Sequence, residues 1–199
     1  MTLQPFARLL APALLCSTLV QQAWAAPQTI VVLDAQGQPV VQAVVTVMVK
    51  GAPTRAAAGA SAEMAQRNKR FRPDLLVVQT GTAVRFPNLD TVRHHVYSFS
   101  PIHPFEIKLY AGTPAAPVVF DKPGTATLGC NIHDQMLAYI HVVDSPYFGI
   151  TDERGQVSID IPSGEHRLRI WTATMGENKA DVEVPLRTSD APAMVRLPG

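Results

Sequence analysis

The sequence predicts an all-β protein, built as a β-sandwich or Greek-key barrel that is inserted in, or flanked by, a second small β-sandwich. Short β-branched and aromatic runs follow one another closely from residue 28 onwards. Gly, Pro and Asn separate these runs, which is the pattern of sandwiches and barrels. A Cys, a His and a Met also stand three residues apart in "CNIHDQM" (130–136), which places a candidate metal site in the middle of the chain.

The N-terminus is expected to be a secretory signal peptide covering residues 1–25. A basic start with Arg8 precedes the apolar run "LLAPALLCSTLV" (9–20), and "AWA" (23–25) supplies the small residues that a signal peptidase requires. The run is too short to span a bilayer, and no later segment approaches that length. Cleavage would leave a periplasmic or secreted chain without a membrane span. A retained N-terminal anchor is the alternative.

Charge and cysteine content narrow the function of the mature chain. The whole chain has 17 basic and 16 acidic residues, so removal of Arg8 with the signal leaves a neutral protein. Neutrality gives no reason to expect binding to nucleic acid or to a membrane. Cys16 departs with the signal as well, which leaves Cys130 alone. A lone thiol in an oxidising compartment should be buried, paired between chains or bound to a metal.

The strand-like runs form three groups along the chain. Residues 28–49 contain two β-branched runs around a Gly-containing turn, and residues 52–69 read as a linker or crossover with room for a short helix in its second half. The middle group consists of "DLLVVQTG", "TAVRFPN", "HHVYSFS", "FEIKLY", "PVVFDKPG", "TATLGC" and "LAYIHVVD". The last group, after "SPYFG", consists of "GQVSIDIPSG", "EHRLRIWTA" and "KADVEVPL".

The first and last groups resemble two halves of a transthyretin-like sandwich, as in the carboxypeptidase regulatory domain. "VLDAQGQPVVQAVVTV" is similar to the start of that module, and "TDERGQVSIDIPSGEHRLRIW" is similar to its continuation. We therefore expect residues 28–51 and 144–199 to form one outer sandwich, with residues 62–143 as a separate inserted domain. One larger sandwich with decorated ends is the alternative.

Cys130, His133 and Met136 offer a thiolate, an imidazole and a thioether. This soft set suits copper better than zinc, calcium or magnesium, and blue-copper sites add a second His to it. "HHV" (94–96) can supply that His from a neighbouring strand. Because adjacent strand residues point to opposite faces, one of the two should face the metal. We choose His94, with His95 as the alternative upstream ligand.

Residues 62–143 resemble the cupredoxins, and the ligand loop is most similar to those of amicyanin and plastocyanin. The marks are "FRPDLLVVQTGTAVRFPN" (71–88), "VVFDKPGTATLGC" (118–130), "YIHVV" (139–143) and the C-x-x-H-x-x-M spacing of amicyanin. Two positions depart from the family: His95 replaces the Asn after the upstream ligand, and Ile132 replaces the Pro before the loop His. The resemblance implies a Greek-key copper domain with one type 1 site on His94, Cys130, His133 and Met136.

The same resemblance implies a one-electron carrier that cycles between Cu(I) and Cu(II) and exchanges electrons with a partner such as a dehydrogenase or a cytochrome. The edge of His133 is the implied exit, beside an apolar patch of Ile132, Leu137 and Pro101. Cupredoxins with a transthyretin-like part are often associated with methylamine utilisation, although nothing in these residues recognises an amine. A non-redox copper chaperone, buffer or sensor is the alternative function.

We expect no enzymatic activity. The H-x-H pairs that a multicopper oxidase needs do not occur in the sequence. Cys130, His133 and Asp134 share one short loop, where a relayed nucleophile set is hard to build.

The other His and aromatic residues are interpreted as structural. We expect His103, His141 and His166 to be ordinary loop, strand and surface residues. Four phenylalanines are assigned to the core, and Trp171 is expected to pack the two domains together. The four are Phe71, Phe86, Phe99 and Phe120.

Overall fold

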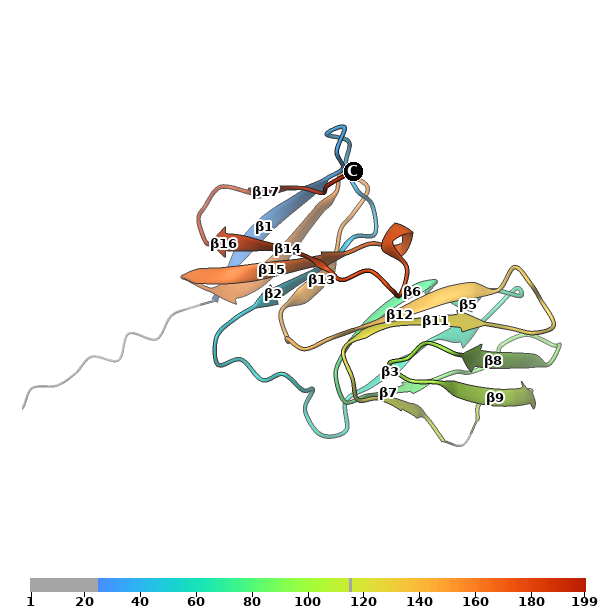
Figure 1. The fold of residues 1–199 in the computed structure, drawn as a ribbon. Helices are drawn as coiled ribbons and strands as arrows, with labels where there is room; N and C mark the ends of the chain where they lie inside the picture. Colours follow the sequence, from blue (N-terminus) through green and yellow to red (C-terminus); the bar gives the residue numbers. More distant parts are fainter. Residues whose placement is uncertain (1–24, 115) are drawn as a thin grey trace, which may run out of the picture.

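Strands from both ends of the chain build one lobe of the molecule, and strands from its middle build the other (Figure 1). The computed structural model describes residues 25–114 and 116–199. The predicted signal peptide therefore lies outside the described residues, except for Ala25. Apart from one short 3-10 helix, the regular elements of the described chain are β-strands, so the predicted all-β class is confirmed.

The outer lobe contains two sheets whose strands come from both ends of the chain. In one, β1 (Ala25–Leu33) lies between β14 (Gln156–Pro162) and β17 (Ala193–Arg196). The other has the order β13 (Phe148–Ile150), β2 (Val44–Met48), β15 (Glu165–Trp171) and β16 (Val182–Arg187). Between them lies an apolar core that includes Ile30, Val45 and Leu168. Residues roughly 120 to 140 positions apart thus pair directly, as β1 with β14 and β2 with β15. Its transthyretin-like character stays a prediction.

The inner lobe carries the candidate metal ligands. Its large sheet has the order β6 (Leu75–Gln79), β12 (Leu137–Val143), β11 (Gly124–Gly129), β8 (His94–Ser98) and β9 (Phe105–Tyr110). A smaller sheet contains β10 (Val118–Phe120), β7 (Thr82–Arg85) and β3 (Ser61–Glu63), and β4 (Ala65–Gln66) pairs with β5 (Phe71–Arg72). Cys130 and Met136 belong to the apolar core of this lobe, so the candidate site is built at its edge.

Two expectations about this lobe need correction. The second half of the segment 52–69, where the sequence left room for a short helix, contains the strands β3 and β4. The parallel pairing of β3 with β7 outweighs the helix preference of Ala there. Phe71, Phe86 and Phe120 are buried as expected, but Phe99 is 80% exposed. Phe99 follows the end of β8, where its side chain falls outside the core.

Two Asp-x-x-Gly turns shape the outer lobe in the same way. Asp34 Oδ1 accepts the backbone N–H groups of Gln36 and Gln38, and Asp152 Oδ1 accepts those of Arg154 and Gln156. The backbone hydrogen bond from Gln156 is the main reason that the pKa of Asp152 lies below its ordinary value. Each turn continues through a glycine with positive φ, and Gly155 is the more constrained of the two. A Cβ there would lie 2.6 Å from the Val32 carbonyl oxygen.

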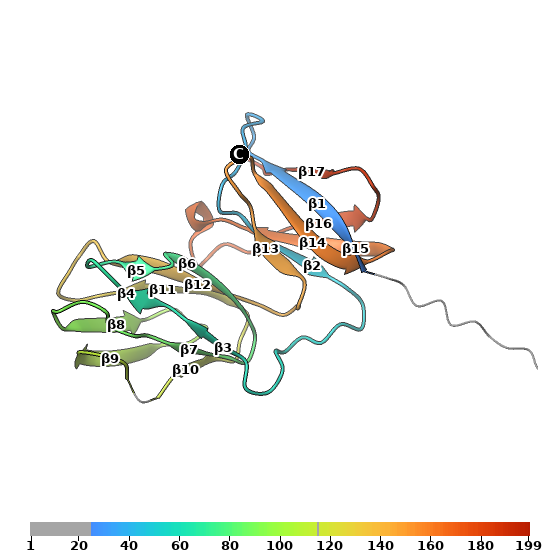
Figure 2. The ribbon, with the colours of Figure 1, turned by 180° about the vertical axis from the view of Figure 1, so that it is seen from behind.

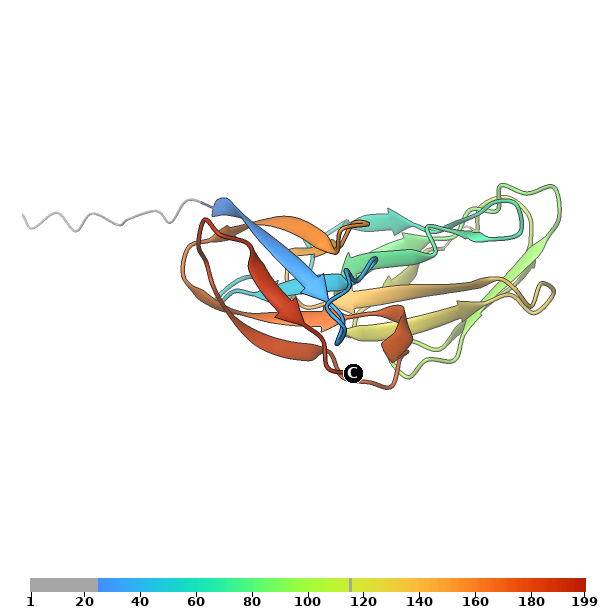
Figure 3. The same ribbon diagram turned by 90° about the horizontal axis from the view of Figure 1, so that it is seen from above.

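The lobes meet around Trp171, the last residue of β15, and Figures 2 and 3 show the two lobes from behind and from above. The buried indole stacks on His141 of β12, with ring centroids 4.8 Å apart, and meets Tyr139 edge-on. Its Nε1–H donates to the Gly176 carbonyl. Val44 and Val143 complete this small cluster. Trp171 therefore packs the lobes together, as expected from the sequence.

His141 is buried where the two lobes meet, whereas we expected an ordinary strand residue. It is 2% exposed, and its Nδ1 lies 2.9 Å from the Thr125 hydroxyl. Burial lowers the pKa of His141 from 6.5 to about 4. The Asp181 carboxylate is 3.8 Å from Nε2, too far to hold a proton there.

In the part of the chain that the structure describes, no helix has the length and apolar character of a membrane span.

Gly155→Ala should destabilise the protein strongly, because the new methyl adds a clash with the Val32 carbonyl to the strain of a positive φ. Gly59→Ala is the matched control: φ is +81°, but nothing lies within 4 Å of the added Cβ. We expect the control to lose about 1–2 kcal/mol of unfolding free energy and Gly155→Ala clearly more, measured by urea unfolding. Equal losses would show that the contact with Val32 relaxes freely.

Acidification should weaken the metal-free protein through His141. Below pH 6.5 the unfolded chain binds a proton that buried His141 does not, so the free energy of unfolding falls as the pH falls towards 4. Between pH 7 and 5 this amounts to about 2 kcal/mol. Burial also raises the pKa of Asp181, which acts in the opposite sense. His141→Gln should therefore lose less stability than wild type over this interval; an equal or larger loss would contradict the assignment.

Candidate metal centre

A seven-residue loop between two paired strands presents the Cys, the His and the Met. β11 and β12 are antiparallel, and their last pair is Gly129 with Leu137. Cys130 follows β11 directly, and Met136 directly precedes β12. Inside the loop, the Met136 N–H donates to the His133 carbonyl at 2.9 Å, which closes a turn. The strand pairing therefore fixes both ends of the loop.

His94 reaches the same place from the neighbouring strand β8. Tyr97 pairs with Gly129, so the antiparallel course of β8 brings its first residue beside the loop. One donor atom each from His94, Cys130 and His133 lies within 4.8 Å of the others. The Cys130 sulfur is 4.0 Å from Nδ1 of His94 and 3.8 Å from Nδ1 of His133. The ring centroids of His94 and His133 are 5.0 Å apart.

These distances fit a shared metal ion. With metal–sulfur and metal–nitrogen bonds of about 2.3 and 2.0–2.1 Å, a trigonal site separates sulfur from nitrogen by about 3.8 Å. Both sulfur–nitrogen separations are also long for direct hydrogen bonds, even to sulfur. Both sulfur–nitrogen separations therefore match those of a thiolate and an imidazole bound to one ion, and this donor set suits copper.

Met136 and His95 differ in how they relate to this cluster. Met136 is 2% exposed and packs in the same core cluster as Cys130. His95 is also buried, but its ring lies beside Tyr97, and its Nε2 is 2.8 Å from the Glu106 carboxylate. The structure thus brings His94 to Cys130 and His133 and leaves His95 outside the cluster.

Asp90 holds the His94 ring from behind. Its Oδ2 is 2.8 Å from Nε2 of His94, on the opposite side of the ring from the sulfur, so a proton on Nε2 leaves Nδ1 free for a metal. The carboxylate also accepts the backbone N–H groups of Asn68 and Lys69, two successive residues with positive φ. Burial alone would raise the pKa of Asp90, but the hydrogen bonds from Lys69, His94 and Asn68 outweigh it and lower the pKa.

Asn88 fixes the loop that leads to His94. Its Oδ1 accepts the Asp90 N–H, and its Nδ2 donates to the carbonyls of Val92 and Tyr110. Tyr110, the last residue of β9, is anchored in turn, because its hydroxyl lies 2.6 Å from Gln66 Oε1 and 2.7 Å from the Phe86 carbonyl. Burial raises the pKa of Tyr110 to about 12, so the phenol stays a donor.

Among His94, Cys130 and His133, His133 is the residue that solvent reaches. His94 is fully buried, whereas His133 is partly exposed. Ile132, inside the loop, is 49% exposed, and Leu137, which follows the loop, is 54% exposed. Pro101 is exposed as well. The three residues expected to form an apolar patch are thus all at the surface.

Sequence reasoning missed Asp90 and Asn88, which touch a ligand or support its loop. "FPNLD" (86–90) contained the available signal, an Asx-type turn just before the His pair. Nothing in that turn indicates that the Asp side chain reaches forward to His94. The other histidines lie elsewhere: His103 is near Phe105 and Phe120, and His166 Nε2 lies 2.8 Å from the Pro162 carbonyl.

Comparison with known proteins gives matches to solved structures. No protein-family model matches the chain, and no curated protein matches it. A reduced amicyanin variant is 19% identical, covering 49% of this chain and 97% of its own, with a TM-score of 0.38. A Cu-containing nitrite reductase from Thermus scotoductus SA-01 is 24% identical, covering 49% of this chain and 25% of its own, with a TM-score of 0.40. A purple cupredoxin from Nitrosopumilus maritimus is 20% identical, covering 42% and 98%, with a TM-score of 0.36.

Asp90→Ala should lower the affinity for copper, because His94 loses the partner that fixes its ring and tautomer. We expect a loss of roughly 10- to 100-fold, measured by competition with a chromophoric Cu(I) chelator. Glu106→Gln is the matched control, since it alters the carboxylate that contacts His95. Similar losses in both variants would mean that the Asp90 contact has no special role.

Proposed function

We propose that the mature protein is a periplasmic or secreted type 1 copper protein that carries one electron at a time between partner proteins. The observation that carries the proposal is the convergence of His94, Cys130 and His133 within 4.8 Å, at the edge of an apolar core. Met136 is the proposed fourth ligand, because it ends the same loop and is buried in the same core cluster as Cys130. Bound copper would supply the change between Cu(I) and Cu(II).

The residues around the cluster favour carrying electrons over other uses of copper. Three of the four proposed ligands lie on one loop closed by strand pairing, and the fourth is held by Asp90 and Asn88. Such a rigid cage suits an electron carrier, because the ligands need to move little when one electron is gained or lost. A chaperone, which must hand over its metal, would be served better by an exposed and flexible site.

We further propose a carrier and not an enzyme. Four protein side chains would hold the copper here, whereas catalytic zinc sites typically have three protein ligands and a bound water. The partner would be a redox protein such as a dehydrogenase or a cytochrome. Exchange through the partly exposed His133 is supported by the exposed apolar side chains of Ile132 and Leu137 beside it. A link to methylamine utilisation rests on family resemblance alone.

Cys130→Ser should abolish an intense visible absorption band that the wild-type protein shows after loading with Cu(II). The band is expected because a thiolate bound to Cu(II) donates charge to it on excitation, and ascorbate should bleach it reversibly. His94→Ala should lose the band as well, whereas His95→Ala, the matched neighbour, should keep it. The measurement is the visible spectrum of the purified mature chain and of the three variants.

Other outcomes assign the site differently. Stoichiometric copper binding without the band would favour a non-redox chaperone, buffer or sensor. Loss of the band in His95→Ala but not in His94→Ala would move the upstream ligand. Failure to bind copper at all would remove the metal from the proposal.

A further inference from the structure

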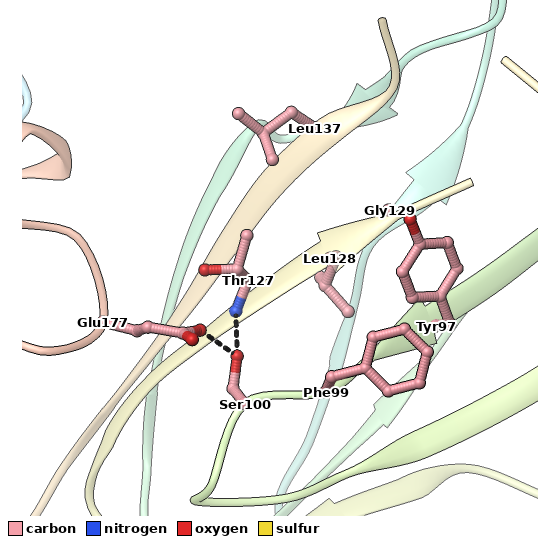
Figure 4. A pocket seen from close by; sticks show the side chains of 8 residues that line it. All are labelled: Tyr97, Phe99, Ser100, Thr127, Leu128, Gly129, Leu137 and Glu177. Atoms are coloured by element: carbon pink, nitrogen blue, oxygen red, sulfur yellow. Dashed lines mark hydrogen bonds between the residues drawn. The ribbon is translucent and has the colours of Figure 1, made fainter. Parts of the chain in front are cut away.

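A groove on the side of the inner lobe is lined by two aromatic rings, a leucine and a carboxylate. Figure 4 shows Tyr97 and Phe99 side by side, with Glu177 facing them across Ser100 and Thr127. Tyr97 and Leu137 belong to strands of the large sheet, Phe99 follows the end of β8, and Glu177 comes from the β15–β16 connection of the outer lobe. These four residues define the lateral groove. It needs both lobes, and it does not include His133.

The lateral groove lies one residue away from the proposed copper ligand Cys130. A Cβ placed on Gly129 would be 2.7 Å from Cζ and Oη of Tyr97, so the phenol ring rests directly on the Gly129 backbone. Phe99 continues this contact outwards, with its ring centroid 5.0 Å from that of Tyr97. Because electron tunnelling weakens steeply with distance, a partner seated on these rings would be close to the thiolate through Gly129.

Phe99 is the most exposed of the large apolar side chains in the described chain, at 80%. Exposed aromatic residues beside a groove are characteristic of interaction sites, where they become energetic anchors on binding. Leu137 extends the apolar surface at 54% exposure.

Charge and size indicate what the groove can receive. Glu177 is its charged group, and none of the described residues that line it is basic. The Glu177 carboxylate accepts the Ser100 hydroxyl, and Ser100 Oγ accepts the Thr127 N–H, so the carboxylate is held in place. On the neighbouring strand β9, Glu106 pairs with Tyr97, and Lys108 lies two residues further along. The groove volume is about 240 Å³, below the range of roughly 300–1,000 Å³ typical of small-molecule sites.

We propose that the lateral groove receives an arginine side chain of the redox partner, an inference that rests on the function proposed above. A guanidinium group is planar, stacks on aromatic faces and pairs with a carboxylate through two donors. Stacked on Phe99 and paired with Glu177, it would seat the partner over Tyr97. The protein would then have a lateral docking surface in addition to the His133 face.

Binding can be tested without copper, by titrating the labelled metal-free protein with N-acetyl-arginine methylamide and following NMR shifts. We expect saturable shifts at Tyr97, Phe99 and Leu137 and weaker ones with the lysine analogue. Glu177→Gln should abolish them, whereas Glu165→Gln, a change at another exposed glutamate, should not. Shifts that are scattered over the surface, or that persist in Glu177→Gln, would overturn the proposal whether or not the protein binds copper.

The redox role needs a second measurement on the copper-loaded, reduced protein. The oxidant is a tris-bipyridine ruthenium(III) complex with a guanidinium-terminated arm, compared with one carrying an alkylammonium arm. One electron leaves the protein and reduces ruthenium(III) to ruthenium(II), with no proton transferred. Both arms can pair with Glu177, but the planar guanidinium also stacks on Phe99, so we expect its complex to react about two- to fivefold faster, as a cation on an exposed aromatic ring allows. Glu177→Gln and Phe99→Leu should each remove this advantage.

Ile132→Ser, a change beside His133, is the control that should keep the advantage. If the visible copper band is present but the two complexes react equally fast, the lateral groove has no redox role, and the proposed copper carrier stands. If the copper band is absent, the proposed function fails, and the arginine titration alone decides whether the groove binds.

Discussion

The convergence of one thiol and two imidazoles at the edge of an apolar core is the constraint on which the rest of the inner lobe depends. Buried polar groups are costly unless each finds a partner. His94 is fully buried, and one of its two nitrogens is paired with Asp90, while the other faces the Cys130 sulfur at 4.0 Å. The contact with Cys130 depends on the pairing of β8 with β11 and on the closed seven-residue loop. The contact with Asp90 depends on the Asn88 turn and on the backbone N–H groups of Asn68 and Lys69. The burial of His94 therefore requires both the strand pairing and the Asn88 turn.

Much of this arrangement could be predicted from the sequence because it depends on the spacing of residues that are close together in the chain. The three-residue intervals of Cys130, His133 and Met136 predict a ligand loop, and the alternation of short apolar runs predicts the strands. Period two indicates only that one of His94 and His95 faces the metal, and the choice of His94 rests on the family resemblance. Both residues are in fact buried, and an irregularity in the β8–β9 pairing lies between His94 and Val96. It is the partner of each ring, Cys130 or Glu106, that tells them apart.

The features that could not be predicted are those that arise between distant segments. Asp90 acts on His94 only because Asn68 and Lys69 hold its carboxylate, and those residues lie more than twenty positions earlier. His141 reads as an ordinary strand residue until Trp171 from the other lobe covers it. Phe99 resembles the three core phenylalanines in the sequence, and only the end of β8 places it outside. Such facts depend on tertiary contacts, which a local pattern does not contain.

The direct pairing of β1 with β14 and of β2 with β15 has a consequence for the order in which the molecule can assemble. As the chain is synthesised or exported from its N-terminus, β1 and β2 emerge first, and their partners β14 and β15 follow well over one hundred residues later. The strands of the inner lobe become complete before β13 appears, and most of their pairings are closer in sequence. Because long-range pairing is slow and unpaired strand edges are prone to aggregate, we infer that the inner lobe folds first. The folded inner lobe then holds the two flanking segments of the chain close together, so that the strands of the outer lobe can pair.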